Sequence, residues 1–301
     1  MIILQTTDLP QETQHLLEAR FDVIRLPKEP AEREEVLARN GQDIRGIAGT
    51  GKGRVDTALL DRLPNLRIVS SYSAGLDQID TEECARRGIP VENTSHILAE
   101  DVADAALWLL MGAVRRFGEA ERFLQRGDWL NGQAPLGLSM RGMKVGILGL
   151  GHIGKELARR LEVCGCEIAY HGRSRQPVVH RYHDSLIDLA QWCDVLAVCC
   201  PATPETEGLV DRKVFEALGS NGFVVNIARG TVIDEAALAL ALSERRLSGA
   251  GLDVFAQEPH VPASIVQDDR VICLPHVGSA TTQTRAAMGE AMIARLAEAL
   301  T

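Results

Sequence analysis

The sequence predicts an α/β protein built from two doubly wound parallel sheets. Short apolar runs rich in Val, Ile and Leu alternate with polar, helix-like segments along most of the chain, and this alternation favours parallel strands connected by helices. A glycine-rich turn, Gly149–Gly154, lies between one such run and a helical segment. The length of 301 residues predicts two domains, since a domain usually has roughly 100–200 residues.

The N-terminal part of the chain is expected to form the smaller sheet. Its predicted strands are Ile2–Gln5, Asp22–Leu26, Ile44–Ala48 and Leu66–Ser70. Its predicted helices are Gln11–Arg20, Glu32–Arg39, Thr57–Arg62 and Thr81–Arg87. A long helix over Ile97–Arg116 should follow, and then an extended loop over Gly127–Gly142, which glycine and proline interrupt.

The alternation restarts at Lys144 and predicts a larger sheet. Its expected strands are Lys144–Leu150, Cys166–His171, Asp194–Cys200, Gly222–Ile227, Gly249–Phe255 and Val271–Leu274. Helices are expected over Ile153–Val163, Asp211–Leu218 and Asp234–Arg245, with a final amphipathic helix over Thr281–Leu300.

Composition and charge exclude several classes of partner. The formal net charge is −9 and no Lys/Arg-rich run occurs, which argues against nucleic acid or an anionic membrane as a partner. The number of cysteines, seven, is odd, and no C-x-x-C pair occurs among them. This use of cysteine favours a protein inside the cell. The start of the chain lacks a signal-peptide pattern, and the apolar stretch Ala105–Val114 is too short to span a bilayer. We therefore expect a soluble cytoplasmic protein.

The turn Gly149–Gly154 has the GxGxxG pattern of a dinucleotide-binding loop. It follows the apolar run Val145–Leu148 and precedes a helical segment, as that fingerprint requires. Gly149 would permit the tight turn, Gly151 would let the backbone approach a pyrophosphate, and Gly154 would let helix and strand pack closely. The helix N-terminus would supply N–H groups to the phosphates. The alternative is a glycine-rich turn without a ligand.

The end of the next strand indicates which dinucleotide is bound. An NAD site places Asp or Glu there to bind the ribose 2′-hydroxyl, but this sequence has Gly172-Arg173-Ser174-Arg175. Guanidinium groups and a hydroxyl suit a 2′-phosphate. We expect NADP(H) to be preferred, with NAD(H) possible if an arginine only stacks on the adenine.

Three residues at successive strand ends suggest a catalytic group. Arg229 follows the fourth strand of the larger sheet, Glu258 follows the fifth and His276 follows the sixth. In reduction of a 2-keto acid, His276 would donate the proton, Glu258 would orient its ring and stabilise its protonated form, and Arg229 would bind the carboxylate. The alternative for each residue taken singly is an ordinary solvated side chain.

These features occur within motifs that resemble the D-isomer-specific 2-hydroxyacid dehydrogenases. The similarity covers nearly the whole chain and includes the turn Gly149–Gly154 and the segments Ser71–Asp80, Asp101–Asp104, Cys200–Thr206, Asn226–Gly230, Gly249–Phe255 and Leu274–Ser279. Gly172-Arg173-Ser174 and Pro275–Ser279 are most similar to the NADPH-dependent glyoxylate/hydroxypyruvate reductases and the hydroxyphenylpyruvate reductases.

The resemblance implies roles for further residues. The backbone at Ala74 and Gly75, with the loop containing Gly51, would bind substrate together with Arg229. Val102 would pack near the nicotinamide, and Asp253 would bind its carboxamide. The remaining expected cofactor contacts are His152, Ile153, Cys200, Pro201, Thr206, Ile227, Ala228 and Gly278.

The resemblance also implies how the chain is divided. A flavodoxin-like substrate domain would comprise residues 1–97 and 281–301, and a Rossmann NADP-binding domain would be inserted over residues 98–280. The C-terminal helix would then pack on the N-terminal domain. The long helix over Ile97–Arg116 and the loop after it would form a homodimer contact.

Two further features carry weaker hypotheses. Lys52, flanked by Gly51 and Gly53, could contact a second anionic group on the substrate, although we favour a solvated lysine; the glycines could instead admit a bulky substrate. His180 and His183 have the i, i+3 spacing of metal ligands on a helix, but no third ligand is evident. We expect no metal.

The function predicted from the sequence is NADPH-dependent reduction of a small 2-keto acid, of the glyoxylate or hydroxypyruvate type, to the D-2-hydroxy acid. One alternative is a dehydrogenase of another small acid, of the hydroxyphenylpyruvate, ketogluconate or phosphite type. Another is a dinucleotide-sensing corepressor on the same fold, since fold alone does not establish activity.

Overall fold

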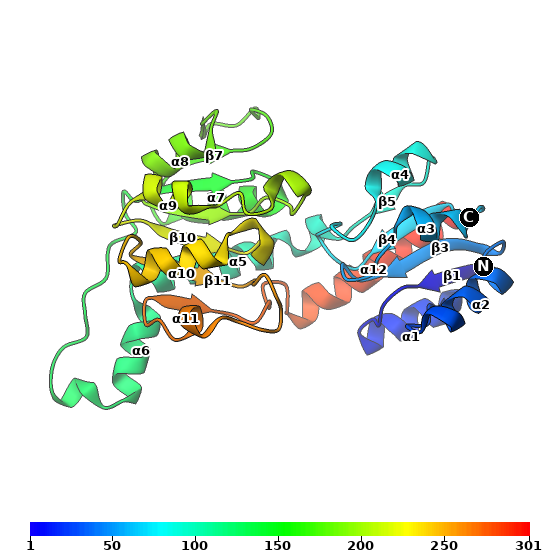
Figure 1. Cartoon of the computed structure of the whole chain (residues 1–301), viewed down its shortest axis with the longest axis horizontal. Coiled ribbons are helices and arrows are strands. Elements are labelled where there is room, and N and C mark those ends of the chain that lie inside the picture. The colour runs from blue at the N-terminus through cyan, green and yellow to red at the C-terminus, as the bar shows by residue number, and fades with distance from the viewer. The chain divides into compact units, whose positions relative to one another are not determined.

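The computed structural model describes every residue of the chain, 1–301, and divides into two compact units (Figure 1). The first unit comprises Met1–Leu98 and Ala280–Thr301, and the second comprises Ala99–Ser279. Each unit contains one parallel sheet flanked by helices, which confirms the predicted fold class.

The first unit is built on a five-stranded parallel sheet with the order β2-β1-β3-β4-β5, a flavodoxin-like order. Its strands are β1 (Ile2–Gln5), β2 (Asp22–Arg25), β3 (Ile44–Gly49), β4 (Ile68–Ser71) and β5 (Val91–Glu92). Its helices are α1 (Gln11–Arg20), α2 (Pro30–Asn40), α3 (Thr57–Asp61), α4 (Thr81–Arg86) and α12 (Thr282–Leu300). The sequence prediction missed β5, because a strand of two residues shows no periodicity.

The C-terminal helix α12 packs within the first unit, against α1 and the strands β3 and β4. The buried hydroxyl of Ser70 on β4 donates to the Met292 carbonyl of α12 over 3.1 Å. The Tyr72 hydroxyl donates to the Arg285 carbonyl over 2.8 Å. The two ends of the chain therefore belong to one folded unit.

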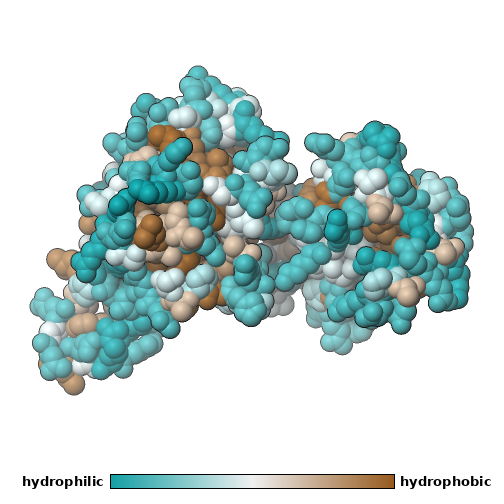
Figure 2. Space-filling view, in the orientation of Figure 1, coloured by the Kyte–Doolittle hydropathy of each residue, from teal (hydrophilic) through white to brown (hydrophobic).

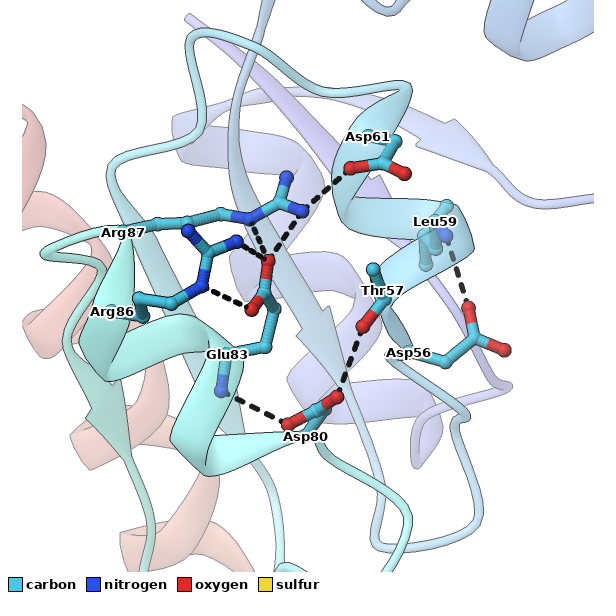
Figure 3. Close-up of polar contacts among 8 residues, drawn as sticks. All are labelled: Asp56, Thr57, Leu59, Asp61, Asp80, Glu83, Arg86 and Arg87. Carbon is cyan, nitrogen blue, oxygen red and sulfur yellow. Dashed lines mark hydrogen bonds and ion pairs between the residues drawn. The ribbon is translucent and has the colours of Figure 1, made fainter.

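An ion-pair network joins α3 to α4 in the first unit (Figure 3). Glu83 on α4 accepts hydrogen bonds from both Arg86 and Arg87, and Arg87 also pairs with Asp61 at the end of α3. These guanidinium groups, Arg86 first, lower the pKa of Glu83 to about 2. Asp80 caps the N-terminus of α4 by accepting from the Glu83 amide over 3.0 Å, and the two arginines stand at the C-terminal end of the same helix.

The second unit is built on a seven-stranded parallel sheet with the order β12-β11-β10-β9-β6-β7-β8. Its strands are β6 (Lys144–Leu148), β7 (Glu167–His171), β8 (Arg181–Tyr182), β9 (Val195–Val198), β10 (Phe223–Asn226), β11 (Gly249–Leu252) and β12 (Val271–Cys273). Its helices are α6 (Phe117–Gln125), α7 (His152–Val163), α8 (Leu186–Trp192), α9 (Arg212–Leu218), α10 (Glu235–Ser243) and α11 (Ala263–Val266). Helix α5 (Ser95–Val114) contains the boundary between the units. This is the Rossmann strand order with one additional edge strand.

Several elements of this unit are absent from the sequence prediction, namely β8, α6, α8 and α11. Helix α6 follows α5 after a break at Arg116, whose φ of 56° is left-handed, and a short 3-10 helix (Asp128–Leu130) interrupts the expected extended loop. The pair His180 and His183 flanks strand β8 and does not lie on a helix, so the two rings do not have the spacing expected of metal ligands. No group of three or more potential metal ligands occurs in residues 1–301.

Each unit has its own apolar core. In the second unit the strands β9 and β10 are buried along their whole length, as expected for the centre of a parallel sheet. Seven free cysteines are present, and burial raises the pKa of Cys193 to about 12 and of Cys200 to about 11. The face of the molecule drawn in Figure 2 is mostly hydrophilic, with scattered apolar patches. None of the helices combines the length and the apolar character needed to cross a membrane.

Candidate functional site

The carboxyl ends of the strands in the second unit carry most of the predicted site residues. The strand order reverses between β6 and β9, and open α/β sheets bind ligands at the carboxyl ends of strands beside such a reversal. The turn Gly149–Gly154 leaves β6 at this point and leads into α7. The site is therefore built on the edge at which a doubly wound sheet usually binds a nucleotide.

The three glycines of this turn have different surroundings. Gly149 has a φ of 96°, and a Cβ there would lie 2.6 Å from the Cys200 Cα. A Cβ at Gly154 would lie 2.3 Å from the Gly149 carbonyl oxygen, so helix α7 packs closely on the turn. A Cβ at Gly151 would meet nothing within 4 Å. The first and third glycines thus permit close packing, whereas the second faces open space in which a ligand could approach the backbone.

The N-terminus of α7 presents unpaired donors beside Gly151. Gly151 is the N-cap residue and supplies no side-chain cap, and the first turn of the helix contains no acidic residue. The amides of His152, Ile153 and Gly154 donate to no acceptor in the chain, whereas the Lys155 amide donates to the Gly151 carbonyl over 3.0 Å. Free N–H groups and the helix dipole together favour an anion such as a pyrophosphate.

The segment after β7 carries positive charge without an acidic partner. Arg173, Ser174 and Arg175 are exposed, and neither arginine forms an ion pair. Gly172 is held by its carbonyl, which accepts from the Tyr182 hydroxyl over 3.0 Å. The arrangement suits a phosphate dianion and lacks the carboxylate that would bind a free 2′-hydroxyl.

Gln176, which sequence reasoning did not select, positions this segment. The Gln176 side chain donates to the Leu150 carbonyl over 2.8 Å, and its backbone amide donates to the Tyr170 hydroxyl over 2.7 Å. Gln176 therefore ties the arginine-bearing segment to the glycine-rich turn. No local motif could have identified this contact, because its partners are 26 residues apart and the bond uses a backbone carbonyl.

The residues predicted after β9 and β10 form the next part of the site. The Cys200 backbone packs against Gly149, and the raised pKa of the Cys200 thiol keeps it protonated near neutral pH. The Thr206 hydroxyl donates to the Pro201 carbonyl over 2.8 Å and holds the loop after β9 in a compact turn. Ile227 and Ala228, which follow β10, are both buried.

Arg229 is positioned by a buried asparagine at the end of β10. The Asn226 side chain donates to the Arg229 carbonyl over 2.9 Å and accepts from the Ala228 amide over 3.0 Å. The guanidinium itself donates to the Ala228 carbonyl over 2.8 Å. Asn226 is another positioning residue that the sequence analysis did not select, although it begins one of the quoted motifs.

His276 and Glu258 form a hydrogen-bonded pair. The Nδ1 atom of His276 lies 2.8 Å and 3.0 Å from the two carboxylate oxygens of Glu258. Because a carboxylate only accepts, Nδ1 carries the proton, and Nε2 is left to exchange a proton with another group. The His276 side chain is 43% exposed, so Nε2 can reach a molecule outside the protein.

Asp253 holds the loop that carries His276. Its carboxylate is buried and accepts from the amides of Val277, over 2.8 Å, and Gly278, over 2.9 Å. Burial raises the pKa of Asp253, and these two amide donors oppose that shift. Val102 packs beside Gly278. The contact of Asp253 with a nicotinamide carboxamide remains a prediction, and what the structure shows is its bond to the loop.

The first unit brings together the predicted substrate residues Gly51, Ala74 and Gly75. A Cβ at Gly51 would lie 2.8 Å from the Ser73 hydroxyl and 3.4 Å from the Gly75 carbonyl. The Ala74 carbonyl accepts from the Asn93 side chain, and the Gly75 carbonyl accepts from the Ser73 hydroxyl. The backbone amides of Gly51, Ala74 and Gly75 donate to nothing in the chain, so this cluster offers unpaired donors to an anion.

Comparisons with known proteins agree with this chemistry. Residues 107–278 match the family model described as "D-isomer specific 2-hydroxyacid dehydrogenase, NAD binding domain". The chain is 42% identical to glyoxylate/hydroxypyruvate reductase A of Arabidopsis thaliana, covering 98% of this chain and 94% of that protein. It is also 42% identical to hydroxyphenylpyruvate reductase of Plectranthus scutellarioides, covering 98% and 93%.

A solved structure is similar over nearly the whole chain as well. The NADPH-dependent glyoxylate/hydroxypyruvate reductase of Sinorhizobium meliloti, in complex with NADP and malonate, superposes with a TM-score of 0.86 at 40% identity. The match covers 97% of this chain and 91% of that one.

Proposed function

The chain belongs to the family of D-isomer-specific 2-hydroxyacid dehydrogenases, and on that premise we propose that it reduces a small 2-keto acid to the D-2-hydroxy acid with NADPH. The observation that carries the proposal is the His276–Glu258 pair, with Nδ1 2.8 Å from the carboxylate, in the same unit as the GxGxxG turn. Glyoxylate and hydroxypyruvate are the proposed substrates, since the relatives from Arabidopsis and Sinorhizobium are named for them.

In the proposed reaction, bound NADPH supplies the hydride that reaches the keto carbon. His276 Nε2 donates the proton that the developing alkoxide takes up, while Glu258 stabilises the protonated ring through Nδ1. Arg229 and the amides of Gly51, Ala74 and Gly75 bind the substrate carboxylate and orient the ketone. Ketone reduction requires a proton donor, and His276 suits this role because Glu258 holds its Nδ1 atom and leaves its Nε2 atom free to face the substrate.

The proposed cofactor preference is for NADP(H). Arg173 and Ser174 support it, because they are exposed at the end of β7 and no carboxylate stands there. The amides at the start of α7 are proposed to bind the pyrophosphate, with Gly172, Cys200, Pro201, Thr206, Ile227, Ala228, Asp253, Gly278 and Val102 around the rest of the cofactor. NAD(H) is expected to bind more weakly, since a charge-assisted hydrogen bond contributes about 1.5–3 kcal/mol.

We also propose that the protein forms a homodimer. Exposed apolar side chains in the segment after α6 support this, since large apolar groups in contact with solvent often mark interfaces. They are Trp129, Leu130, Leu136 and Leu138.

The proposal is tested by supplying purified protein with NADPH or NADH and a panel of 2-keto acids while cofactor absorbance is followed. We expect oxidation of NADPH with glyoxylate or hydroxypyruvate, and a lower kcat/KM with NADH. Chiral analysis of the product should show the D isomer. If the protein binds NADPH but turns over no 2-keto acid, the proposed function is wrong and a dinucleotide-sensing role becomes the better explanation.

A further inference from the structure

The loop Thr50–Gly53 of the first unit carries a lysine that the proposed reaction does not use. The loop follows β3, in a sheet with the order β2-β1-β3-β4-β5. In a parallel sheet of this order, the strand order reverses between β1 and β3. Ligands usually bind at the carboxyl ends of the strands beside that reversal. Lys52 therefore stands on the loop where this fold usually contacts a ligand.

The backbone of this loop is fixed against the end of β1. The Thr50 amide donates to the Thr7 hydroxyl over 2.7 Å, and that hydroxyl donates to the Thr50 hydroxyl over 3.1 Å. The Gly53 amide donates to the Thr50 carbonyl over 3.0 Å, which closes a tight turn. A Cβ at Gly53 would lie 2.3 Å from the Thr6 hydroxyl, so a side chain there would push the loop away. Lys52 thus projects from an ordered turn.

The same turn adjoins the amides to which we assign the substrate carboxylate. Gly51 packs against Ser73 and Gly75, and the unpaired amides of Gly51, Ala74 and Gly75 lie in this cluster. Lys52 follows Gly51 directly in the chain. The chain therefore carries a cation on a flexible stem one residue from Gly51, whose amide is one of the unpaired donors.

The charge of Lys52 is not neutralised within the protein. The residue is exposed, and its ammonium group forms no ion pair. The nearby carboxylate of Asp56 is taken by Arg54 at 2.8 Å. The exposed Asp8, which follows Thr7, is not paired with Lys52 either. The loop therefore holds one positive charge that is available to a ligand.

We propose that Lys52 makes the enzyme favour 2-keto acids that carry a second anionic group, a carboxylate or a phosphate, remote from the keto acid function. The inference rests on the proposed function and adds an order of preference among the 2-keto acids that the enzyme reduces. Composition alone favours a solvated lysine. The ordered turn, its position at the reversal of the strand order and its packing against Ser73 and Gly75 favour a substrate contact.

The test uses matched substrates that differ in one anionic group. Oxaloacetate is compared with 2-oxobutanoate for the carboxylate, and phosphohydroxypyruvate with hydroxypyruvate for the phosphate, each by kcat/KM with NADPH. In Lys52→Met the ratio for at least one pair should fall by about 10- to 100-fold, which is the effect of losing a charge-assisted hydrogen bond. Lys52→Arg should retain most of the ratio. The pair that responds identifies the anionic group.

The control is Lys213→Met, which removes the same charge from an exposed position on α9 of the other unit and should leave both ratios unchanged. Binding of D-malate and of D-2-hydroxybutanoate to the enzyme–NADPH complex, followed by cofactor fluorescence, provides a readout without turnover. An unchanged ratio in Lys52→Met, or equal losses in Lys213→Met, overturns the inference while keto-acid reduction still stands. If no keto acid is reduced, the proposed function fails, and D-malate binding that is insensitive to Lys52→Met then overturns the inference separately.

Discussion

Replacing Gly151 by alanine should separate ligand binding from folding at the glycine-rich turn. The new Cβ meets no protein atom within 4 Å, and the residue has a φ of −80°, which alanine adopts readily. The expected cost to folding is the replacement of an N-cap glycine, about 1 kcal/mol or less. The methyl group would instead occupy the space through which a pyrophosphate approaches the backbone.

The magnitude of the binding loss follows from the donors at the start of α7. If the methyl group displaces the phosphates enough to lose one charge-assisted hydrogen bond, about 1.5–3 kcal/mol is lost. Since about 1.4 kcal/mol corresponds to a tenfold change, the Kd for NADPH should rise roughly 10- to 100-fold. Titration of NADPH fluorescence measures this, and thermal unfolding measures stability in the same sample.

Two further alanine variants complete the experiment. Gly154→Ala places a Cβ 2.3 Å from the Gly149 carbonyl oxygen, so overpacking should destabilise the protein by about 1–3 kcal/mol and lower its Tm. Ser220→Ala changes an exposed side chain away from the turn and should change neither quantity. The reasoning is refuted if Gly151→Ala binds NADPH like the unaltered protein, or if it loses as much stability as Gly154→Ala.

Two other substitutions test separate parts of the account. Glu258→Gln preserves the shape of the carboxylate but removes the charge that stabilises protonated His276. The kcat/KM for hydroxypyruvate should therefore fall about 10- to 100-fold while the Kd for NADPH is unchanged. Unaltered turnover would contradict the role of the pair. Glu83→Gln removes a carboxylate whose pKa the guanidinium of Arg86 lowers to about 2, so its stabilising contribution is complete above about pH 4.5 and is lost as the pH falls toward 2. The difference in Tm between the two proteins should shrink over that interval, and a difference that is independent of pH would show that the ion pairs do not stabilise the fold.

The elements that could be predicted are those with enough residues to show a pattern. Strands β9 and β10 are continuous apolar runs, and the structure buries every residue of both. Strands β5 and β8 each contain two residues, too few for periodicity to indicate anything. Strand β8 forms only because it pairs with β7, a contact that depends on the tertiary structure.

In the site, too, residues that form a continuous motif could be predicted, and contacts between distant parts of the chain could not. The glycine-rich turn was evident because its residues are consecutive, and the structure gives Gly149 and Gly154 a steric reason to be glycine. The supporting contacts of Gln176 and Asn226 were missed, because each binds a backbone carbonyl and polar side chains of this kind are common in loops. The spacing of His180 and His183 carries no information about a shared ligand, because the two residues flank strand β8 and i, i+3 neighbours face one another only on a helix.

The most direct test of the central claim is a single-turnover experiment on His276. Residue 276 has a φ of 55°, and asparagine tolerates this left-handed conformation better than most residues, so His276→Asn is the suitable variant. Enzyme loaded with NADPH is mixed with excess hydroxypyruvate in a stopped-flow instrument, and the Kd for NADPH is measured separately. We predict that the rate of NADPH oxidation falls by roughly 10²- to 10⁴-fold while the Kd is unchanged. An unchanged rate, or a loss explained by weaker NADPH binding, would contradict the assignment of His276 as the proton donor.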